Sequence, residues 1–212
     1  VYAFDRANML SPDGTTCPTA RAPQKLTGPG LPGLDFEAFT PVDLDGTPPP
    51  NGAPAYLVRH RDEELNGDAG ASPATDRLEL WSLDVDWDVP GNTELAQLPD
   101  VIVADFDSGL CPFPLSPLVC VPQKGSSLRL DAIVEIVMNR ASYRNFGTHE
   151  SIIAVFQTDV GDFENHLGER WVEARRTGGG AWQLFQEGTY SPDATHRFIG
   201  TTAMDGDGNM LL

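Results

Sequence analysis

Residues 132–160, AIVEIVMNRASYRNFGTHESIIAVFQTDV, decide the expected fold of this chain. Within this stretch, residues 152–158 alternate between two largely apolar faces, which is typical of a β-strand covered on both sides. The Asn-Phe-Gly sequence at 145–147 in front of this strand favours a turn. Residues 130–140 fit either a helical stripe or a strand, and their β-branched side chains favour the strand.

Two more segments toward the C-terminus have strand character. Residues 169–176 and 181–187 each carry a tryptophan, and the glycines at 178–180 between them suit a tight hairpin. The DGDGN tract at 205–209 predicts another hairpin turn between two short apolar runs. The sequence ends inside the last predicted strand, which would lack a partner, so we expect the chain to be part of a longer protein.

These segments predict an all-β fold made of four-stranded antiparallel blades, as in an incomplete β-propeller. We expect one domain over residues 1–212, with blades at about 1–110 and 130–190 and the start of a further blade at 195–212. The proline-rich residues 11–50 are expected to form a long loop. The first blade would use residues 1–10, 55–59, 78–87 and 101–106, and the second would use 132–143, 149–159, 169–176 and 181–187.

Six motifs spread along the chain carry a resemblance to known proteins. They are AFDRANML (3–10), DLDGTPPPNGAPAY (43–56), CVPQKG (120–125), YRNFGTHES (143–151), RWVEAR (170–175) and QEGTYSPDATHRFIGTTAMDGDGN (186–209). With these motifs the sequence resembles a family of large secreted bacterial proteins of uncharacterised function, for which a β-propeller fold is expected. The resemblance implies a bacterial protein that is secreted or displayed on the cell surface and that contacts the remainder of its own polypeptide. It supplies no catalytic residues.

The chain has three cysteines, Cys17, Cys111 and Cys120. Cys111 and Cys120 flank a short proline-rich loop, and the resembled family places a cysteine pair there. A disulfide between them is therefore expected in a secreted setting, with two buried free thiols as the alternative. Cys17 would be free or would pair with a part of the protein outside this sequence. Zinc is not expected, because no cysteine or histidine cluster has ligand spacing.

The composition excludes several classes of partner. The formal net charge is −17 and the pI is near 4.3, so neither nucleic acid nor an anionic membrane surface is an expected partner. No apolar run approaches the roughly 20 residues that span a bilayer, so no membrane span is expected. The 21 glycines and 18 prolines fit a turn-rich, all-β chain. A soluble acidic surface explains the charge, with calcium binding or a saline habitat as alternatives.

Two groups of aspartates are weak candidates for calcium. Asp205 and Asp207 resemble the start of an EF-hand loop, but the glutamate and helices of an EF-hand are missing, so a hairpin turn is preferred. Asp84, Asp86 and Asp88 alternate along one predicted strand, where like charges must be solvated, paired or bridged by a cation. We therefore expect no metal and no other cofactor, and we keep calcium as the alternative.

Four residues could serve catalysis, namely Glu187, Tyr190, Arg170 and Glu150. Sialidase-type propellers use a tyrosine nucleophile beside a carboxylate, together with an arginine cluster. Glu187 and Tyr190 are three positions apart around Gly188, which could let both face one site. Arginines on strands more often pair with surface acids, however, and the chain has no serine-hydrolase elbow, zinc-protease motif or phosphate loop. No catalytic residue is assigned, and these four form the enzyme alternative.

The expected function is that of an interaction module. Four tryptophans could stack on sugar rings if exposed, although such residues more often pack between sheets. The sequence therefore predicts a secreted or cell-surface structural or interaction module without catalysis, adhesive or glycan-binding, whose partner is an extracellular protein or a glycan. The alternative is a glycoside hydrolase or a sialidase-like enzyme. The tryptophans are Trp81, Trp87, Trp171 and Trp182.

Overall fold

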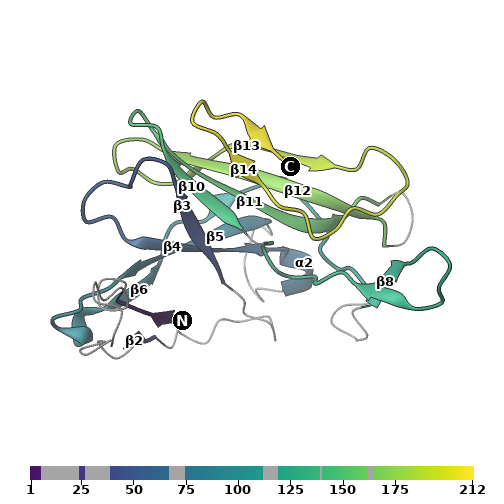
Figure 1. The fold of residues 1–212 in the computed structure, drawn as a ribbon, viewed down its shortest axis with the longest axis horizontal. Helices are drawn as coiled ribbons and strands as arrows, with labels where there is room; N and C mark the ends of the chain where they lie inside the picture. The colour runs from purple at the N-terminus through teal and green to yellow at the C-terminus, as the bar shows by residue number, and fades with distance from the viewer. Residues whose placement is uncertain (6–23, 27–38, 67–74, 112–118, 139, 162–164) are drawn as a thin grey trace, which may run out of the picture.

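The computed structural model is nearly all β, as the sequence predicts, and its main sheet curls into a half-barrel (Figure 1). In the described part of the chain, no helix is long and apolar enough to cross a membrane. The short helix α2 spans Glu63–Asn66, and a 3-10 turn spans Pro90–Asn92. The structure describes residues 1–5, 24–26, 39–66, 75–111, 119–138, 140–161 and 165–212.

The main sheet has nine strands in the order β13-β12-β11-β10-β3-β4-β5-β6, with β7 beside β5. One half consists of β3 (Thr40–Asp45), β4 (Ala55–Arg61), β5 (Arg77–Asp84), β6 (Glu94–Gln97) and β7 (Val101–Ile102). The other half consists of β10 (Ala141–Asn145), β11 (Glu150–Asp159), β12 (Leu167–Arg176) and β13 (Gln183–Tyr190). Within each half, the pairs of neighbouring strands are antiparallel.

Strand β3 joins the two halves by changing its partner along its length. Its first residues pair antiparallel with β4, Thr40 lying opposite Val58, and its later residues pair parallel with β10, Leu44 lying opposite Tyr143. The Thr40 hydroxyl also donates a hydrogen bond to the carbonyl of Val137 (2.6 Å). The expected propeller of separate four-stranded blades is not confirmed, because both strand sets lie in one sheet. The expectation of a loop throughout residues 11–50 was wrong at β3 and at Gln24–Lys25, which form a short strand.

The segment between residues 132 and 140 also differs from the expected strand. Ile133 and Glu135 have positive φ angles of 53° and 63°, which break the extended conformation and end the strand pattern. The chain returns to the sheet through the Met138 N–H, which donates to the carbonyl of Val155 (2.8 Å). Strand β10 therefore begins at Ala141, and the preceding residues form an irregular bend rather than a strand or a helix.

Alternate side chains of both halves point into the half-barrel and form its core. His60 lies among them with its ring stacked on Phe156, the ring centroids 4.4 Å apart. Burial lowers the pKa of His60 to about 4, so the imidazole is neutral at pH 7. The core comprises Val42, Tyr56, Val58, Leu78, Leu80, Val101, Val103, Phe106, Val137, Ala141, Tyr143, Ile152, Ala154, Phe156, Val172, Ala174 and Trp182.

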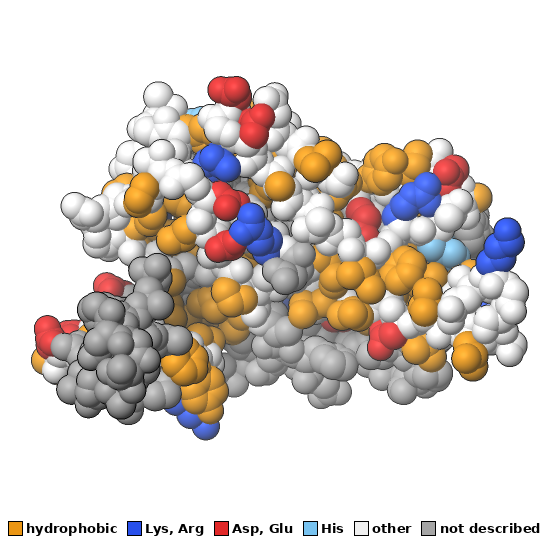
Figure 2. Space-filling view, viewed as in Figure 1, with side chains coloured by type: hydrophobic (Ala, Val, Ile, Leu, Met, Phe, Trp, Pro, Cys, Tyr) orange, Lys and Arg blue, Asp and Glu red, His pale blue; other side chains and the backbone are white. Residues whose placement is uncertain are grey.

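A C-terminal hairpin, formed by β14 (Ala203–Met204) and β15 (Met210–Leu211), lies beside β12 and β13 (Figure 1). Viewed from the same side, hydrophobic side chains are interspersed with charged ones on the surface (Figure 2). The chain leading into this hairpin is held by Gly200, whose N–H donates to the Glu169 carboxylate (2.7 Å). A side chain at position 200 would collide with that carboxylate, because a Cβ there would lie 2.7 Å from its carbon.

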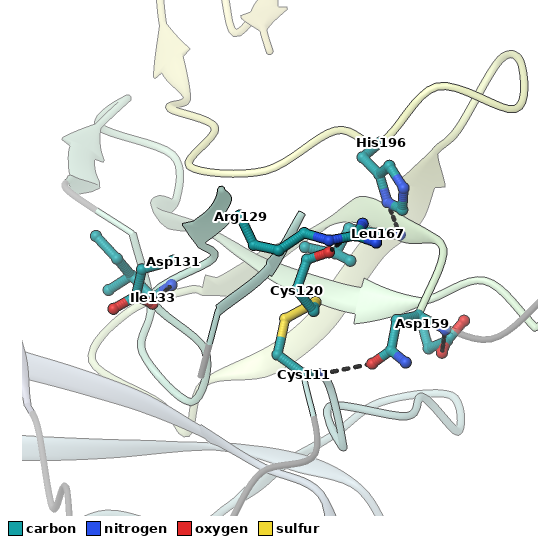
Figure 3. The surroundings of a disulfide bond; sticks show 9 residues. Cys111, Cys120, Arg129, Asp131, Ile133, Asp159, Leu167 and His196 are labelled. Carbon is teal, nitrogen blue, oxygen red and sulfur yellow. Dashed lines mark hydrogen bonds between the residues drawn. A yellow bond between two sulfur atoms is a disulfide. The ribbon is translucent and has the colours of Figure 1, made fainter. Parts of the chain in front are cut away.

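Outside the main sheet, Cys111 and Cys120 form a disulfide, as expected, with Cα atoms 5.0 Å apart (Figure 3). The Cys111 N–H donates to the side-chain oxygen of Asn165 (2.6 Å), and Arg129 donates to the Cys120 carbonyl (3.2 Å). Both cysteines pack in a second, smaller core with Leu167. Cys17 lies outside the described residues. Further hairpins are β1 (Tyr2–Ala3) with β2 (Gln24–Lys25) and β8 (Val119–Pro122) with β9 (Arg129–Asp131).

Replacing Cys111 and Cys120 together by serine should lower the free energy of unfolding by about 2–3 kcal/mol, because the unfolded chain gains loop entropy. Urea denaturation of the oxidised wild type and of the double variant measures this difference. Added reductant should bring the wild type to the stability of the variant and leave the variant unchanged. Equal stability of the oxidised wild type and the variant would contradict the expectation.

Glu169 should make stability depend on pH. One of its oxygens is buried without a hydrogen-bond partner among the described atoms. Burial raises the pKa of Glu169 from 4.5 to about 7, opposed by the hydrogen bond from Gly200. The folded state then binds the extra proton, so stability should fall as the pH rises from 4.5 through 7.

At pH 8, Glu169→Gln should therefore be more stable than the wild type by about 1–3 kcal/mol, and at pH 4 the two should be similar. Thermal and urea denaturation across this pH range measure the effect. A difference between the two proteins that stays constant from pH 4 to pH 8 would show that Glu169 does not titrate in this way.

Candidate functional site

The loops at one end of the half-barrel enclose a pocket of about 480 Å³, which we call the loop-end pocket. They join β3 to β4, β10 to β11 and β12 to β13, and they lie together at the left of Figure 1. Mouths of curled sheets are common ligand sites, and this volume is in the usual range for them. The polar side chains that line the pocket are Asn51, Asn145, Thr148, His149, Glu150 and Arg176.

An ion pair between the partly buried Arg176 and the buried Glu150 forms one wall of the loop-end pocket. Arg176 donates from Nε to Glu150 Oε1 (2.9 Å) and from Nη2 to Glu150 Oε2 (2.6 Å). The Tyr143 hydroxyl donates to the same Oε2 (2.7 Å). Burial alone would raise the pKa of Glu150, but the hydrogen bonds from Arg176 and Tyr143 hold it below its ordinary value. Burial and the bond to Glu150 raise the pKa of Tyr143. Glu150 is therefore ionised at neutral pH with both oxygens engaged.

Aromatic rings hold the Arg176 guanidinium in place. It lies 4.7 Å from the ring centroid of Trp182 and 5.2 Å from that of Tyr56, which are cation–π distances. Trp182 and Tyr56 are themselves packed edge to face, with centroids 5.6 Å apart. Both are almost fully buried, so Trp182 packs in the core rather than offering a face to a sugar. Strand β12 thus presents a rigid arginine at the pocket wall.

The β10–β11 turn positions the second polar group of the pocket. Asn145 accepts a hydrogen bond from the Gly147 N–H (2.8 Å) and donates to the Pro48 carbonyl (3.0 Å), which ties this turn to the β3–β4 loop. Gly147 has a φ angle of 78°, a conformation that glycine adopts without strain. The Asn-Phe-Gly signal in the sequence therefore predicted this turn correctly.

The imidazole of His149 closes the same turn. Its ring stacks on Phe146, with centroids 4.8 Å apart, and its Nδ1 lies 3.1 Å from the Thr148 hydroxyl. Its Nε2 is buried without a hydrogen-bond partner among the described atoms, although His149 lines the pocket. A bound molecule with a hydroxyl group could satisfy this nitrogen. Because Glu150 and Arg176 cancel each other's charge, the lining suits an uncharged polar molecule.

Arg170 and Glu187, which the sequence analysis named as catalytic candidates, form an ion pair that binds the backbone of Ala104. We call this arrangement the clamp. Arg170 Nη2 lies 2.7 Å from Glu187 Oε2 and donates to the Ala104 carbonyl (2.9 Å). Glu187 also accepts the Ala104 N–H (3.1 Å). Since Ala104 follows β7, the clamp connects the two outer parts of the half-barrel. A structural role accounts for both side chains.

The structure does not bring the four catalytic candidates together. Tyr190 lines a separate apolar pocket with Trp171, on the opposite face of β13 from Glu187. Glu150 pairs with Arg176, and Arg176 is six residues from Arg170 along β12, about 20 Å at the strand rise. Only Glu150 contributes to the loop-end pocket.

The aspartates considered for calcium act in turns. Asp86 accepts hydrogen bonds from the N–H groups of Asp88 (2.9 Å) and Val89 (2.7 Å). Asp205 accepts the N–H of Asp207 (2.9 Å), as expected for a hairpin turn, and hydrogen bonds from Asn209 lower its pKa. Asp84 ends β5 and is exposed. These groups do not converge on one point among the described residues.

A different acidic group, which we call the acidic pocket, lies at the other end of the half-barrel. Carboxylate oxygens of Asp62, Glu64 and Asp76 lie within 4.8 Å of one another, and such a donor set could hold a divalent cation. Asp62 also accepts the Ser108 N–H (2.7 Å) and Asp76 the Phe106 N–H (2.6 Å), so both have structural roles. The sequence analysis did not single out this group, because Asp76 lies twelve positions after Glu64 and no motif connects them.

Comparison of the chain with protein-family models, curated proteins and solved structures gives no match. The resemblance to a secreted bacterial family therefore stays a prediction. Function has to be inferred from the pockets themselves.

Arg176→Met should lower the free energy of unfolding by about 3–5 kcal/mol, because it leaves the Glu150 carboxylate buried without its partner. The double variant Glu150→Gln/Arg176→Met should lose less than the sum of the two single losses, because the unpaired charge is gone. Chemical denaturation of the four proteins at pH 7 gives the coupling. Additive losses would show that the two side chains do not stabilise each other.

Proposed function

We propose that this protein is a non-catalytic binding module that holds an uncharged glycan in the loop-end pocket. The observation that carries the proposal is the convergence of loops on a polar, charge-balanced pocket in which His149 Nε2 is left without a partner. Sugar hydroxyl groups both donate and accept hydrogen bonds, so they match the amides of Asn51 and Asn145 and the imidazole of His149. The net charge of −17 disfavours acidic glycans.

Binding is better supported than hydrolysis at this pocket. Most glycosidases need two carboxyl groups, one of which must keep a proton near neutral pH. Of the described residues that line the loop-end pocket, Glu150 is the one acid, and its pKa is held low by Arg176 and Tyr143. A glycoside hydrolase or sialidase-like enzyme is the alternative, and it would have to use residues other than this ion pair.

An extracellular setting fits this role. The disulfide between Cys111 and Cys120 is compatible with secretion or cell-surface display. A glycan-binding module in that setting would act in adhesion. The proposal depends on the half-barrel and its loops and does not require a propeller of four-stranded blades.

Titration with neutral oligosaccharides tests the proposal. Cellohexaose, xylohexaose, maltohexaose and mannohexaose are added separately to the ¹⁵N-labelled protein, with sialyllactose as the charged comparison. We expect saturable shifts of the amides of Asn51, Thr148 and His149 with at least one neutral hexaose and none with sialyllactose. His149→Ala and Asn51→Ala should weaken that binding at least tenfold, since each loses hydrogen bonds that the ligand makes.

The matched control is Gln97→Ala, which removes an exposed side-chain amide on β6 outside this pocket. It should bind like the wild type. Reducing sugar is measured in the same samples, and none should be released. Release of sugar by the wild type would support the hydrolase alternative, and shifts that are equal in all variants would place the ligand elsewhere.

A further inference from the structure

A separate cavity lies on the outer face of the sheet near the C-terminal hairpin, with a volume of about 280 Å³. We call it the Trp171 pocket. It combines residues of β11, β12 and β13 with residues of β15, whereas the loop-end pocket lies at the strand ends. The hairpin and the C-terminus lie above β12 in Figure 1. The lining side chains that matter here are Ile153, Trp171, Tyr190, Thr202, Met210 and Leu211.

A glycine positions the indole of this pocket. Gly188 lies directly opposite Trp171 in the pairing of β12 with β13. A Cβ at position 188 would come within 2.9 Å of the Trp171 ring, so only glycine lets the indole lie against β13. Trp171 is partly exposed, unlike the almost fully buried Trp81 and Trp182. The Trp171 ring therefore packs closely on Gly188 and also lines the cavity.

One polar group in this apolar lining lacks a partner. Thr202 is only 6% exposed, and its buried hydroxyl has no hydrogen-bond partner among the described atoms. Buried hydroxyl groups normally have a partner, so an unsatisfied one at a cavity points to a missing acceptor or donor. None of the lining side chains is basic or acidic, which disfavours a charged guest.

We propose that the Trp171 pocket binds a small uncharged molecule that is mainly apolar, such as a phenol, and that carries one oxygen for Thr202. The ring of the molecule would pack against Trp171, Ile153 and Met210, and its oxygen would hydrogen-bond to the Thr202 hydroxyl. The cavity volume of about 280 Å³ exceeds the ~150 Å³ that suffices to hold a benzene ring, so a substituted ring fits with room to spare. This site is independent of the glycan proposal.

The test compares 4-fluorophenol with fluorobenzene, two probes that differ by the oxygen. Binding is followed by ¹⁹F NMR of the probe and by shifts of the Trp171 indole and the Met210 methyl group. We expect saturable binding of both probes, with 4-fluorophenol the tighter. Thr202→Val keeps the side-chain shape and removes the hydroxyl, so it should weaken 4-fluorophenol at least fivefold and leave fluorobenzene unchanged. The matched control, Thr201→Val, alters the exposed neighbour and should change neither.

A second variant keeps the proposal testable if Thr202→Val fails to fold. Met210→Trp adds bulk from the surface hairpin into the cavity and should weaken both probes at least tenfold. Absence of saturable shifts up to the solubility of the probes would overturn the proposal. So would shifts confined to the loop-end pocket, or binding that Met210→Trp leaves unchanged. Equal weakening of both probes by Thr202→Val would overturn the role given to its hydroxyl.

Discussion

The change of partner along β3 is the interaction on which the rest of this structure depends. Without it, β4–β7 and β10–β13 would be two antiparallel sheets, each with an open edge and one uncovered face. The parallel pairing of Leu44 with Tyr143 joins those edges, and the joined sheet curls far enough to enclose one core. The same pairing sets the register of the strand ends, so it also places the loops that form the loop-end pocket.

The open side of the curled sheet is closed by an ion pair, side-chain hydrogen bonds and one isolated β-bridge between Asp107 and Asp159 rather than by a continuous pair of strands. Arg170 and Glu187 hold Ala104 from both its carbonyl and its N–H, and Asp159 donates its N–H to the carbonyl of Asp107 (2.7 Å). These bonds engage one short segment after β7, and the apolar core lies between the polar groups at the two ends of the half-barrel.

Local patterns in the sequence predicted the second half of the sheet well, and in the first half they predicted β4, β5 and β7 but missed β3 and β6. The apolar run of β11 and the turn chemistry at Asn145 and Asp205 depend on neighbouring residues, so they could be read directly. Strand β3 could not, because Pro41 and its polar neighbours resemble a loop and its parallel partner is distant in the chain. The positive φ angle of Ile133 could not be predicted from the sequence, because β-branched residues rarely adopt this conformation. The site could be predicted only in part: Glu150 lines a pocket, whereas Glu187 and Tyr190, three positions apart on a strand, had to face opposite sides.

The parallel pairing of β3 with β10, which we call the seam, also bears on the order in which the chain folds. Each half is a series of consecutive antiparallel strands whose contacts are local, whereas the hydrogen bond from Thr40 to Val137 spans 97 positions. Closing so long a segment costs entropy before it gains contacts, so such contacts slow folding. We expect the two halves to acquire structure first and the seam to form late, which low φ-values for variants of Val42 and high ones within β11 and β12 would show. A chain in which both halves have formed but the seam has not would expose the unpaired edges of β3 and β10. Its folding yield would then depend on how quickly β3 pairs with β10.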